Sequence, residues 1–151
     1  MKHPRNTSVQ DVQFIALNQV FTEGQGSIVF CEEGDHVPFS PKRVYYLYDV
    51  PNQAERGGHA HRALQQVLIA LSGAFDVVVN DGEREEVFRL SQPNEGLYFP
   101  AGLWRELKEF SGGAICLVLA SHVYEESDYI RDRNAFDTWK RDSTSTRSAR
   151  E

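Results

Sequence analysis

The chain has 151 residues, with 40% apolar residues, 25% charged residues and a formal net charge of −6, which excludes a chain that is disordered throughout. This length accommodates one domain with a full core, and the negative charge argues against a nucleic-acid or anionic-membrane surface, since both favour basic patches. No stretch resembles a signal peptide or approaches the ~18 apolar residues of a membrane span, and Cys31 and Cys116 lie in apolar runs, as expected for buried free thiols. We therefore expect a soluble, cytoplasmic protein with no nucleic-acid or membrane partner.

Short β-like runs recur along the chain, with turn residues between them. They are rich in Val, Ile, Phe and Tyr, which favour strands, and no helical pattern separates one run from the next. Asp81-Gly82 predicts a hairpin turn between two of them, because this dipeptide tolerates the positive φ that such turns require. The pattern predicts an all-β fold, a jelly-roll barrel or sandwich, rather than a parallel α/β sheet. The predicted strands are residues 12–17, 27–31, 43–50, 66–73, 74–80, 85–90, 95–100 and 114–120.

The C-terminal part of the chain reads differently. SDYIRDRNAFDTWK, residues 127–140, predicts one short helix with Ser127 as its N-cap. Residues 141–151 carry no large apolar side chain and predict a disordered tail. The sequence therefore indicates a single domain over residues 1–140.

Two histidines stand one residue apart behind a Gly-Gly pair, just before an apolar strand. His59 and His61 match the His-x-His start of the first metal motif of cupin-type jelly rolls, but Gln66 stands where that motif has Glu. The second motif, Pro-x-Gly-x-x-His, begins at Pro100 and carries Arg105 in place of His. A guanidinium stays protonated, cannot be a ligand and repels a dication. The sequence therefore predicts that this site holds no metal.

The histidine pair then needs another explanation. Strand alternation puts the rings of His59 and His61 on one face, toward the barrel interior, where two imidazoles without a metal suit proton transfer near neutral pH. The alternative is that both are turn residues hydrogen-bonded to the backbone. Arg56, Arg62 and Arg105 flank the same motifs. As a set they suggest a phosphorylated ligand, although each one alone is equally typical of a solvated surface charge.

Aromatic side chains near these motifs are further candidates. Tyr46 and Tyr48 share one face of their predicted strand, and Tyr45 lies on the other. Core packing explains one face, whereas a phenol on the other can reach a substrate oxygen, and Tyr46 is our candidate for that role. Trp104 can either stack on a nucleobase or plug the barrel mouth.

Whole segments of the sequence resemble a known family. The segments are RVYYLYDVP, RGGHAHRALQQVLIALSG, GLYFPAGLWREL and VLASHVYEESDYIRD. Over residues 12–137 they are similar, in order and spacing, to the nucleotide-sugar 3,4-ketoisomerases of the cupin superfamily, which act on dTDP-4-oxo-6-deoxy-D-glucose. The resemblance implies a cupin jelly roll that uses no metal or other cofactor and is usually a homodimer. It also implies a 3-keto product that serves the synthesis of amino-sugars for surface polysaccharides such as the lipopolysaccharide O-antigen.

The resemblance implies roles for individual residues. His59 and His61 match the catalytic pair, Tyr46 the strand tyrosine near the sugar, and Arg56 the arginine before the pair, whereas Arg105 departs from the histidine that is common in the family. The isomerisation removes a proton from C3, passes through an enediol(ate) and returns a proton at C4. We assign one histidine as the carbon base and the other, with Tyr46, as a proton relay. Arg56 and Arg105 would hold the diphosphate or the sugar oxygens.

The predicted substrate-binding set is Arg56, Arg62, Gln66, Tyr48, Trp104 and Arg105. Other readings remain open, because a 3,5-epimerase or a ketoisomerase of a UDP-linked 4-keto N-acetyl sugar needs the same enolisation chemistry. A non-catalytic nucleotide-sugar-binding cupin is a third reading, and it leaves the imidazole pair unexplained. For the expected homodimer, the runs in residues 12–31 can add strands to the partner's sheet and so cover exposed edges.

Overall fold

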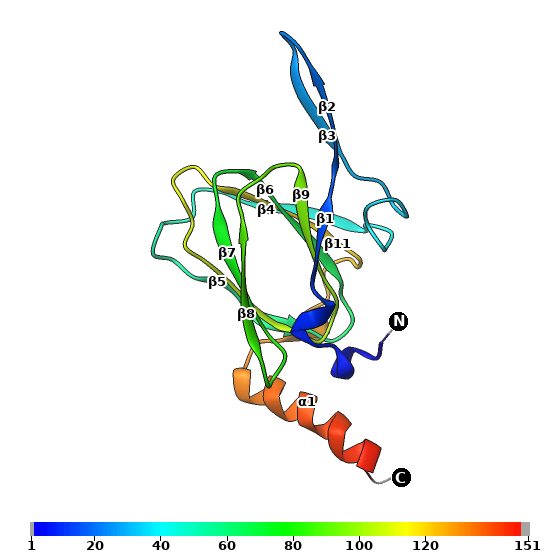
Figure 1. The fold of residues 1–151 in the computed structure, drawn as a ribbon. Helices are drawn as coiled ribbons and strands as arrows, with labels where there is room; N and C mark the ends of the chain where they lie inside the picture. Colours follow the sequence, from blue (N-terminus) through cyan, green and yellow to red (C-terminus); the bar gives the residue numbers. More distant parts are fainter. Residues whose placement is uncertain (1, 149–151) are drawn as a thin grey trace.

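Two antiparallel five-stranded sheets face each other in the computed structural model, which describes residues 2–148 and the side chains of residues 2–142 (Figure 1). Along the first sheet the strands are β1 (Gln13–Ala16), β9 (Glu95–Phe99), β6 (Gln66–Ser72), β11 (Ile115–Ala120) and β4 (Arg43–Leu47). Along the second they are β12 (Tyr129–Ile130), β5 (Arg56–His61), β10 (Trp104–Lys108), β7 (Phe75–Asn80) and β8 (Glu85–Leu90). The crossovers in this order are those of a jelly roll, so the predicted all-β, cupin-type fold is confirmed.

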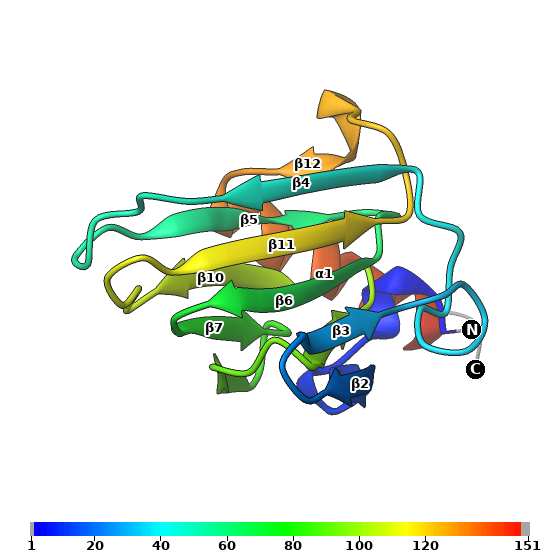
Figure 2. The ribbon, with the colours of Figure 1, turned by 90° about the horizontal axis from the view of Figure 1, so that it is seen from above.

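Alternation along the strands builds the core between the two sheets. In β7, for example, Phe75, Val77 and Val79 are completely buried, while Asp76 on the other face pairs with Arg89 of β8 at 2.9 Å. Inward side chains from both sheets meet in one buried apolar cluster. Figure 2 shows the same sandwich from above, with β11 and β6 of the first sheet in front of β10 and β7 of the second.

The outer face of each sheet is covered by a different part of the chain. Residues of the N-terminal half, among them Leu17, Val37 and Phe39, pack on part of the first sheet. The helix α1 (Arg133–Ser148) covers the second sheet by placing Phe136 against Trp104. The hairpin of β2 (Asn18–Thr22) and β3 (Gly26–Phe30) projects from the body at the end opposite to α1 (Figure 1). The remaining elements are the short helical turns η1 (Pro4–Asn6), η2 (Val9–Asp11) and η3 (Glu126–Asp128).

The structure corrects the predicted start of the helix. Residues 127–130 form a helical turn and the short strand β12, and the helix begins only at Arg133. Asp132 acts as its N-cap, because its carboxylate accepts a hydrogen bond from the N–H of Ala135 at 2.9 Å. The helix continues through Ser148, across most of the segment predicted as a tail, because a helix that is already anchored adds each further residue at little cost. Residues 149–151 lie outside the described residues.

Two further features are the state of the cysteines and the character of the helices. Cys31 and Cys116 are both free, and burial raises the pKa of the Cys116 thiol to about 12. Within residues 2–148, no helix has the length and apolar character that crossing a membrane requires.

Candidate active site

The two histidines lie in contact inside the sandwich. β5 places both rings inward, as alternation predicts, and the side chains of His59 and His61 are 9% and 3% exposed. Their rings are nearly perpendicular, and the two Nε2 atoms lie 3.0 Å apart. Neither two lone pairs nor two N–H groups can face each other at that distance, so the rings share one proton. Tyr129 packs against both rings, with its centroid 4.9 Å from that of His59 and 4.4 Å from that of His61.

A carboxylate orients the inner ring of the pair. The Nδ1 atom of His61 lies 3.2 Å from Oδ2 of Asp128, and the backbone N–H groups of Ala63 and Leu64 donate to the same carboxylate. Burial alone would raise the pKa of Asp128, but these hydrogen bonds hold it below its usual value, so the group is ionised. An ionised carboxylate only accepts hydrogen bonds. His61 therefore carries its proton on Nδ1 and, when neutral, turns a lone pair on Nε2 toward His59.

Both imidazoles are neutral at physiological pH. Burial is the main cause that lowers the pKa of His59, and the positive charge of Arg105 lowers it further. Burial also lowers the pKa of His61 to about 4, although Asp128 opposes this shift. The pair is therefore available as a base across the physiological range.

A buried arginine lies beside the pair and connects it to the opposite sheet. Arg105 is 2% exposed, and its Nη2 atom lies 3.1 Å from Nε2 of His59 and 3.3 Å from the hydroxyl of Tyr45. Gln66 donates from Nε2 to the same hydroxyl at 3.0 Å. β4 contributes Tyr45, β6 contributes Gln66, and β10 contributes Arg105, so three strands hold one polar cluster.

This cluster has polar atoms that no described residue satisfies. They are Nε and Nη2 of Arg43, Nε and Nη1 of Arg105, and Oε1 of Gln66, all buried. Buried donors without partners are costly, and native proteins keep few of them. Arg43, Arg105, Arg56 and Arg131 all line one cavity of about 360 Å³ that also contains His59. The site is therefore built to receive an anion with several oxygen atoms beside a pair of neutral bases.

The predicted tyrosine is on the wrong face of its strand. Tyr46 and Tyr48 are 61% and 63% exposed and lie together on the outside of the first sheet. They line a separate, largely apolar cavity with Leu71 and Leu117. The parity of the three tyrosines was predicted correctly, but Tyr45 faces the histidines and takes the place assigned to Tyr46.

Two of the predicted substrate-binding residues serve the fold instead. Trp104 follows the outward parity of β10, is 6% exposed and packs under α1, so it does not lie at a barrel mouth. Arg62 donates from Nη1 to the carbonyls of Ser127 and Tyr129, both at 2.9 Å, and so fixes the residues on either side of Asp128. Arg56 and Arg105 line the same cavity as His59, and Gln66 contacts the hydroxyl of Tyr45 beside it.

Several site residues were missed by the sequence prediction. Tyr45, Arg43 and Arg131 carry no motif of their own, although Tyr45 follows from alternation once the inward face of β4 is known. Asp128 and Tyr129 were hidden by a segment that imitates a helix start. Acidic residues such as Glu126 and Asp128 are common on protein surfaces. The sequence around Asp128 therefore did not indicate its contact with His61.

No metal-binding cluster accompanies the histidines. Among the residues that the structure describes, no group of three or more His, Cys, Asp and Glu side chains gathers closely enough to hold a metal ion. The guanidinium of Arg105 stands 3.1 Å from His59 instead, and a fixed positive charge at that point does not suit a dication. The donor set present therefore does not fit a cupin metal.

The two antiparallel sheets, in jelly-roll order with a histidine pair facing the interior, form a cupin-type fold. The sequence profile of the family described as "FdtA: WxcM-like, C-terminal" matches residues 10–141, and the chain belongs to that family.

Named relatives agree with this assignment. The chain is 42% identical over 114 residues to the TDP-4-oxo-6-deoxy-alpha-D-glucose-3,4-oxoisomerase of Aneurinibacillus thermoaerophilus, an alignment that covers 76% of this chain and 82% of the relative. The structure of the present chain is similar to that of a 3,4-ketoisomerase from Helicobacter canadensis. The identity is 39%, the TM-score is 0.84, and the alignment covers 87% of this chain and 98% of the other. It is also similar to a histidine-to-asparagine mutant of the 3,4-ketoisomerase QdtA from Thermoanaerobacterium thermosaccharolyticum in complex with TDP-4-keto-6-deoxyglucose. There the identity is 33%, the TM-score 0.85, and the coverage 89% and 96%.

Proposed function

We propose that this protein is a nucleotide-sugar 3,4-ketoisomerase that converts dTDP-4-oxo-6-deoxy-D-glucose to a dTDP-3-oxo-6-deoxy-hexose. The observation that carries the proposal is the pair of buried neutral imidazoles next to unsatisfied guanidinium donors of Arg43 and Arg105. A nucleotide sugar supplies both kinds of partner, since it has anionic phosphate oxygens and an acidic C–H beside a carbonyl. Relatives of 33% to 42% identity carry the name of this activity or of this substrate.

In this reaction the histidine pair moves protons and the oxygen atoms stay in place. One imidazole takes the proton from C3, and the electron pair of the broken C–H bond passes to the C4 oxygen to give the enediolate. The C3 hydroxyl then gives up its proton, which is relayed to the C4 oxygen, as the C3 carbonyl forms and C4 receives a proton from the protonated histidine pair. The substrate and the product are isomers, so no oxidant or cofactor is required. Because His59 and His61 share one proton, the pair can accept a further proton and delocalise the charge toward Asp128.

The surrounding polar groups stabilise the charge that develops. Arg105 and the Tyr45 hydroxyl lie together beside His59, where they can donate to the enediolate oxygens. Arg43 and Arg56 line the same cavity and suit the diphosphate. A bound dianion would offset the positive charge of Arg105 and so raise the pKa of His59, which makes the pair a stronger base in the complex than in the free protein.

The test is turnover in deuterium oxide with EDTA present. Proton NMR should show a 3-keto sugar with deuterium at C4, because the proton delivered there comes from an exchangeable group. Turnover that EDTA abolishes and a metal restores would contradict the metal-independent mechanism. Conversion of a UDP-linked 4-keto N-acetyl sugar in place of the dTDP sugar would keep the enolisation chemistry and reject the proposed substrate.

Asp128→Asn should lower kcat about 10²-fold, because the amide can donate to Nδ1 of His61 and then favours the wrong tautomer. Asp128 raises the pKa of His61, so its loss moves the acidic limb of the kcat/KM profile to lower pH. The matched control is Asp76→Asn, which breaks only the surface pair with Arg89 and should leave the profile unchanged. A wild-type kcat in Asp128→Asn would remove this carboxylate from the mechanism.

We propose a homodimer in which a second copy covers two exposed apolar surfaces. One is the β2–β3 hairpin, where Phe21 and Ile28 are 69% and 67% exposed, and the other is the outer patch of Tyr46, Tyr48 and Leu71. An isolated two-stranded hairpin is marginally stable in water, so packing against a second copy would stabilise this projecting hairpin (Figure 1). The patch on the sheet is apolar and of the kind that marks an interface.

The double substitution of Phe21→Ser with Ile28→Ser should therefore shift the mass in light scattering from dimer to monomer at micromolar concentration. Val87→Ser, on β8 of the other sheet, also removes an exposed apolar side chain, 54% exposed, and should leave the mass unchanged. A wild-type protein that is already monomeric would overturn the proposal.

We further propose that the protein works in the cytoplasm. Two free cysteines suit a reducing compartment, where disulfides are rare. The product would then be consumed in the synthesis of deoxy-amino-sugars for surface polysaccharide, as the sequence resemblance implies.

A further inference from the structure

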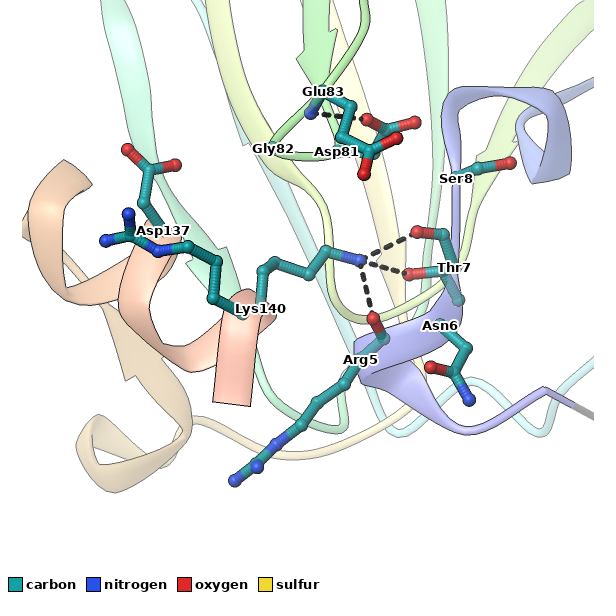
Figure 3. A pocket seen from close by; sticks show the side chains of 10 residues that line it. Arg5, Asn6, Thr7, Ser8, Asp81, Gly82, Glu83, Asp137 and Lys140 are labelled. Atoms are coloured by element: carbon teal, nitrogen blue, oxygen red, sulfur yellow. Dashed lines mark hydrogen bonds between the residues drawn. The ribbon is translucent and has the colours of Figure 1, made fainter. Parts of the chain in front are cut away.

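The ammonium group of Lys140, in α1, is buried among oxygen atoms of the N-terminal segment. The Lys140 side chain is 7% exposed, and its Nζ atom donates to the Thr7 carbonyl at 2.7 Å. Nζ also lies 3.3 Å from Oγ1 of Thr7 and 3.4 Å from the carbonyls of Pro4 and Arg5. Figure 3 shows the side chain reaching from the helix to oxygen atoms of Arg5 and Thr7. We refer to Lys140, Pro4, Arg5 and Thr7 as the Lys140 clamp.

The clamp keeps a charge in a place where burial disfavours it. Burial lowers the pKa of Lys140 from 10.5 to about 8, and the carboxylates of Asp81 and Asp11 oppose this shift. An apolar side chain at this position would avoid the desolvation cost altogether. The buried position of the ammonium group is therefore explained by its hydrogen bonds to several carbonyl oxygens of the N-terminal segment. Asp81 adds a second attachment, because its carboxylate accepts a hydrogen bond from the N–H of Val9 at 3.0 Å.

From the clamp, a short series of contacts leads to the histidine pair. The hydroxyl of Thr7 lies 2.9 Å from the carbonyl of Ala101. Gly102 follows with a φ of +89°, and a Cβ on it would lie 1.8 Å from the carbonyl oxygen of Pro4, so the N-terminal segment sits directly on this glycine. The N–H of Gly102 donates to the carbonyl of His61 at 2.7 Å. The N-terminal segment thus supports the turn that holds the backbone of a catalytic residue.

We propose that Lys140 is a positioning residue for the reaction: by clamping the N-terminal segment it holds Ala101 and Gly102, and through them His61, in the geometry of proton transfer. This rests on the function proposed above for the histidine pair. The family profile matches residues 10–141, so the N-terminal half of the clamp lies outside it.

The main test is Lys140→Met, which keeps the length and apolar stem of the side chain but removes the ammonium. We expect kcat to fall roughly 10-fold or more, because small displacements remote from the chemistry can have large effects on rate. KM should change less than about 2-fold, because the arginines that line the site are untouched. The matched control, Lys108→Met, alters a lysine of β10 outside the clamp and should leave both constants unchanged. Recovery of kcat in Lys140→Ala on addition of n-propylammonium, which replaces the three carbons and the ammonium that the substitution removes, would further support the proposal.

A second readout does not depend on the substrate. Hydrogen exchange of the Gly102 amide, followed by NMR, should become at least about 10-fold faster in Lys140→Met and in the milder Thr7→Val, but not in Lys108→Met. If the wild type does not turn over the sugar, the proposed function fails while this exchange still decides whether the clamp supports the turn. A folded Lys140→Met with wild-type kcat, or with wild-type protection of Gly102, would overturn the proposal and leave Lys140 as a stabilising residue only.

Discussion

His61→Asn and His59→Asn should each lower kcat by ~10²–10⁴-fold, the usual contribution of a positioned acid–base group. Asparagine keeps a polar side chain of similar reach but cannot take a proton. Each substitution also breaks the shared proton between the two Nε2 atoms, which lie 3.0 Å apart. The measurement is single-turnover conversion of the 4-keto sugar, with deuterium incorporation at C3 and C4 followed separately by NMR.

The two variants should differ in which proton they fail to move. The variant that loses the carbon base should show no exchange at C3, whereas the variant that loses the relay should exchange slowly and still bind the nucleotide. His36→Asn provides the matched control, since that imidazole accepts a hydrogen bond from the N–H of Glu32 in an exposed loop and should be dispensable. Wild-type turnover in either site variant would exclude that histidine from the mechanism.

Arg105→Met should lower kcat/KM roughly 10²–10³-fold, the usual effect of removing a donor that stabilises a developing oxyanion. Methionine fills much of the same space, so the fold should survive the loss of a buried charge. The pH profile gives a second readout. After burial, the charge of Arg105 is the largest cause that lowers the pKa of His59, so this pKa rises when the arginine is removed. Activity should then fall on the acidic side at a higher pH than in the wild type.

The control for this prediction is Arg89→Met, which removes a surface guanidinium paired with Asp76 at 2.9 Å. It should change neither kcat/KM nor the pH profile. An Arg105→Met protein that is folded and has an unchanged acidic limb would show that the arginine does not act on His59. Metal-dependent activity in the same variant would indicate that the arginine had replaced a metal ligand.

The features that the sequence predicted correctly depend on short-range periodicity. The jelly roll follows from many short apolar strands, and the contact between His59 and His61 follows from a period of two along β5. The fixed spacing of the two motifs also singled out Arg105 and Gln66, which in the structure both contact the hydroxyl of Tyr45. The same alternation, applied to β10, would also have placed Trp104 on the outside once Arg105 was placed inside.

The features that were missed depend on contacts between distant segments. Both faces of β4 carry tyrosine, so the pattern of RVYYL does not indicate which face turns inward, and the choice of Tyr46 over Tyr45 was wrong. The segment around Asp128 has the polar start and apolar spacing of a helix. In the structure Tyr129 pairs with His61 in a two-residue strand instead, and the true helix cap is Asp132. Pairing with a strand about 70 residues earlier overrides the local preference.

The Lys140 clamp also bears on the order in which the molecule is completed. Thr7 and Lys140 are 133 positions apart, and the chain is synthesised from its N-terminus. Lys140 is therefore translated after both histidines, Arg105 and Asp128. Every strand of both sheets precedes Lys140 in the chain, so the contact between Lys140 and Thr7 is among the last that can form during synthesis. The contact between α1 and the N-terminal segment thus becomes possible only after every residue of the histidine site has been made.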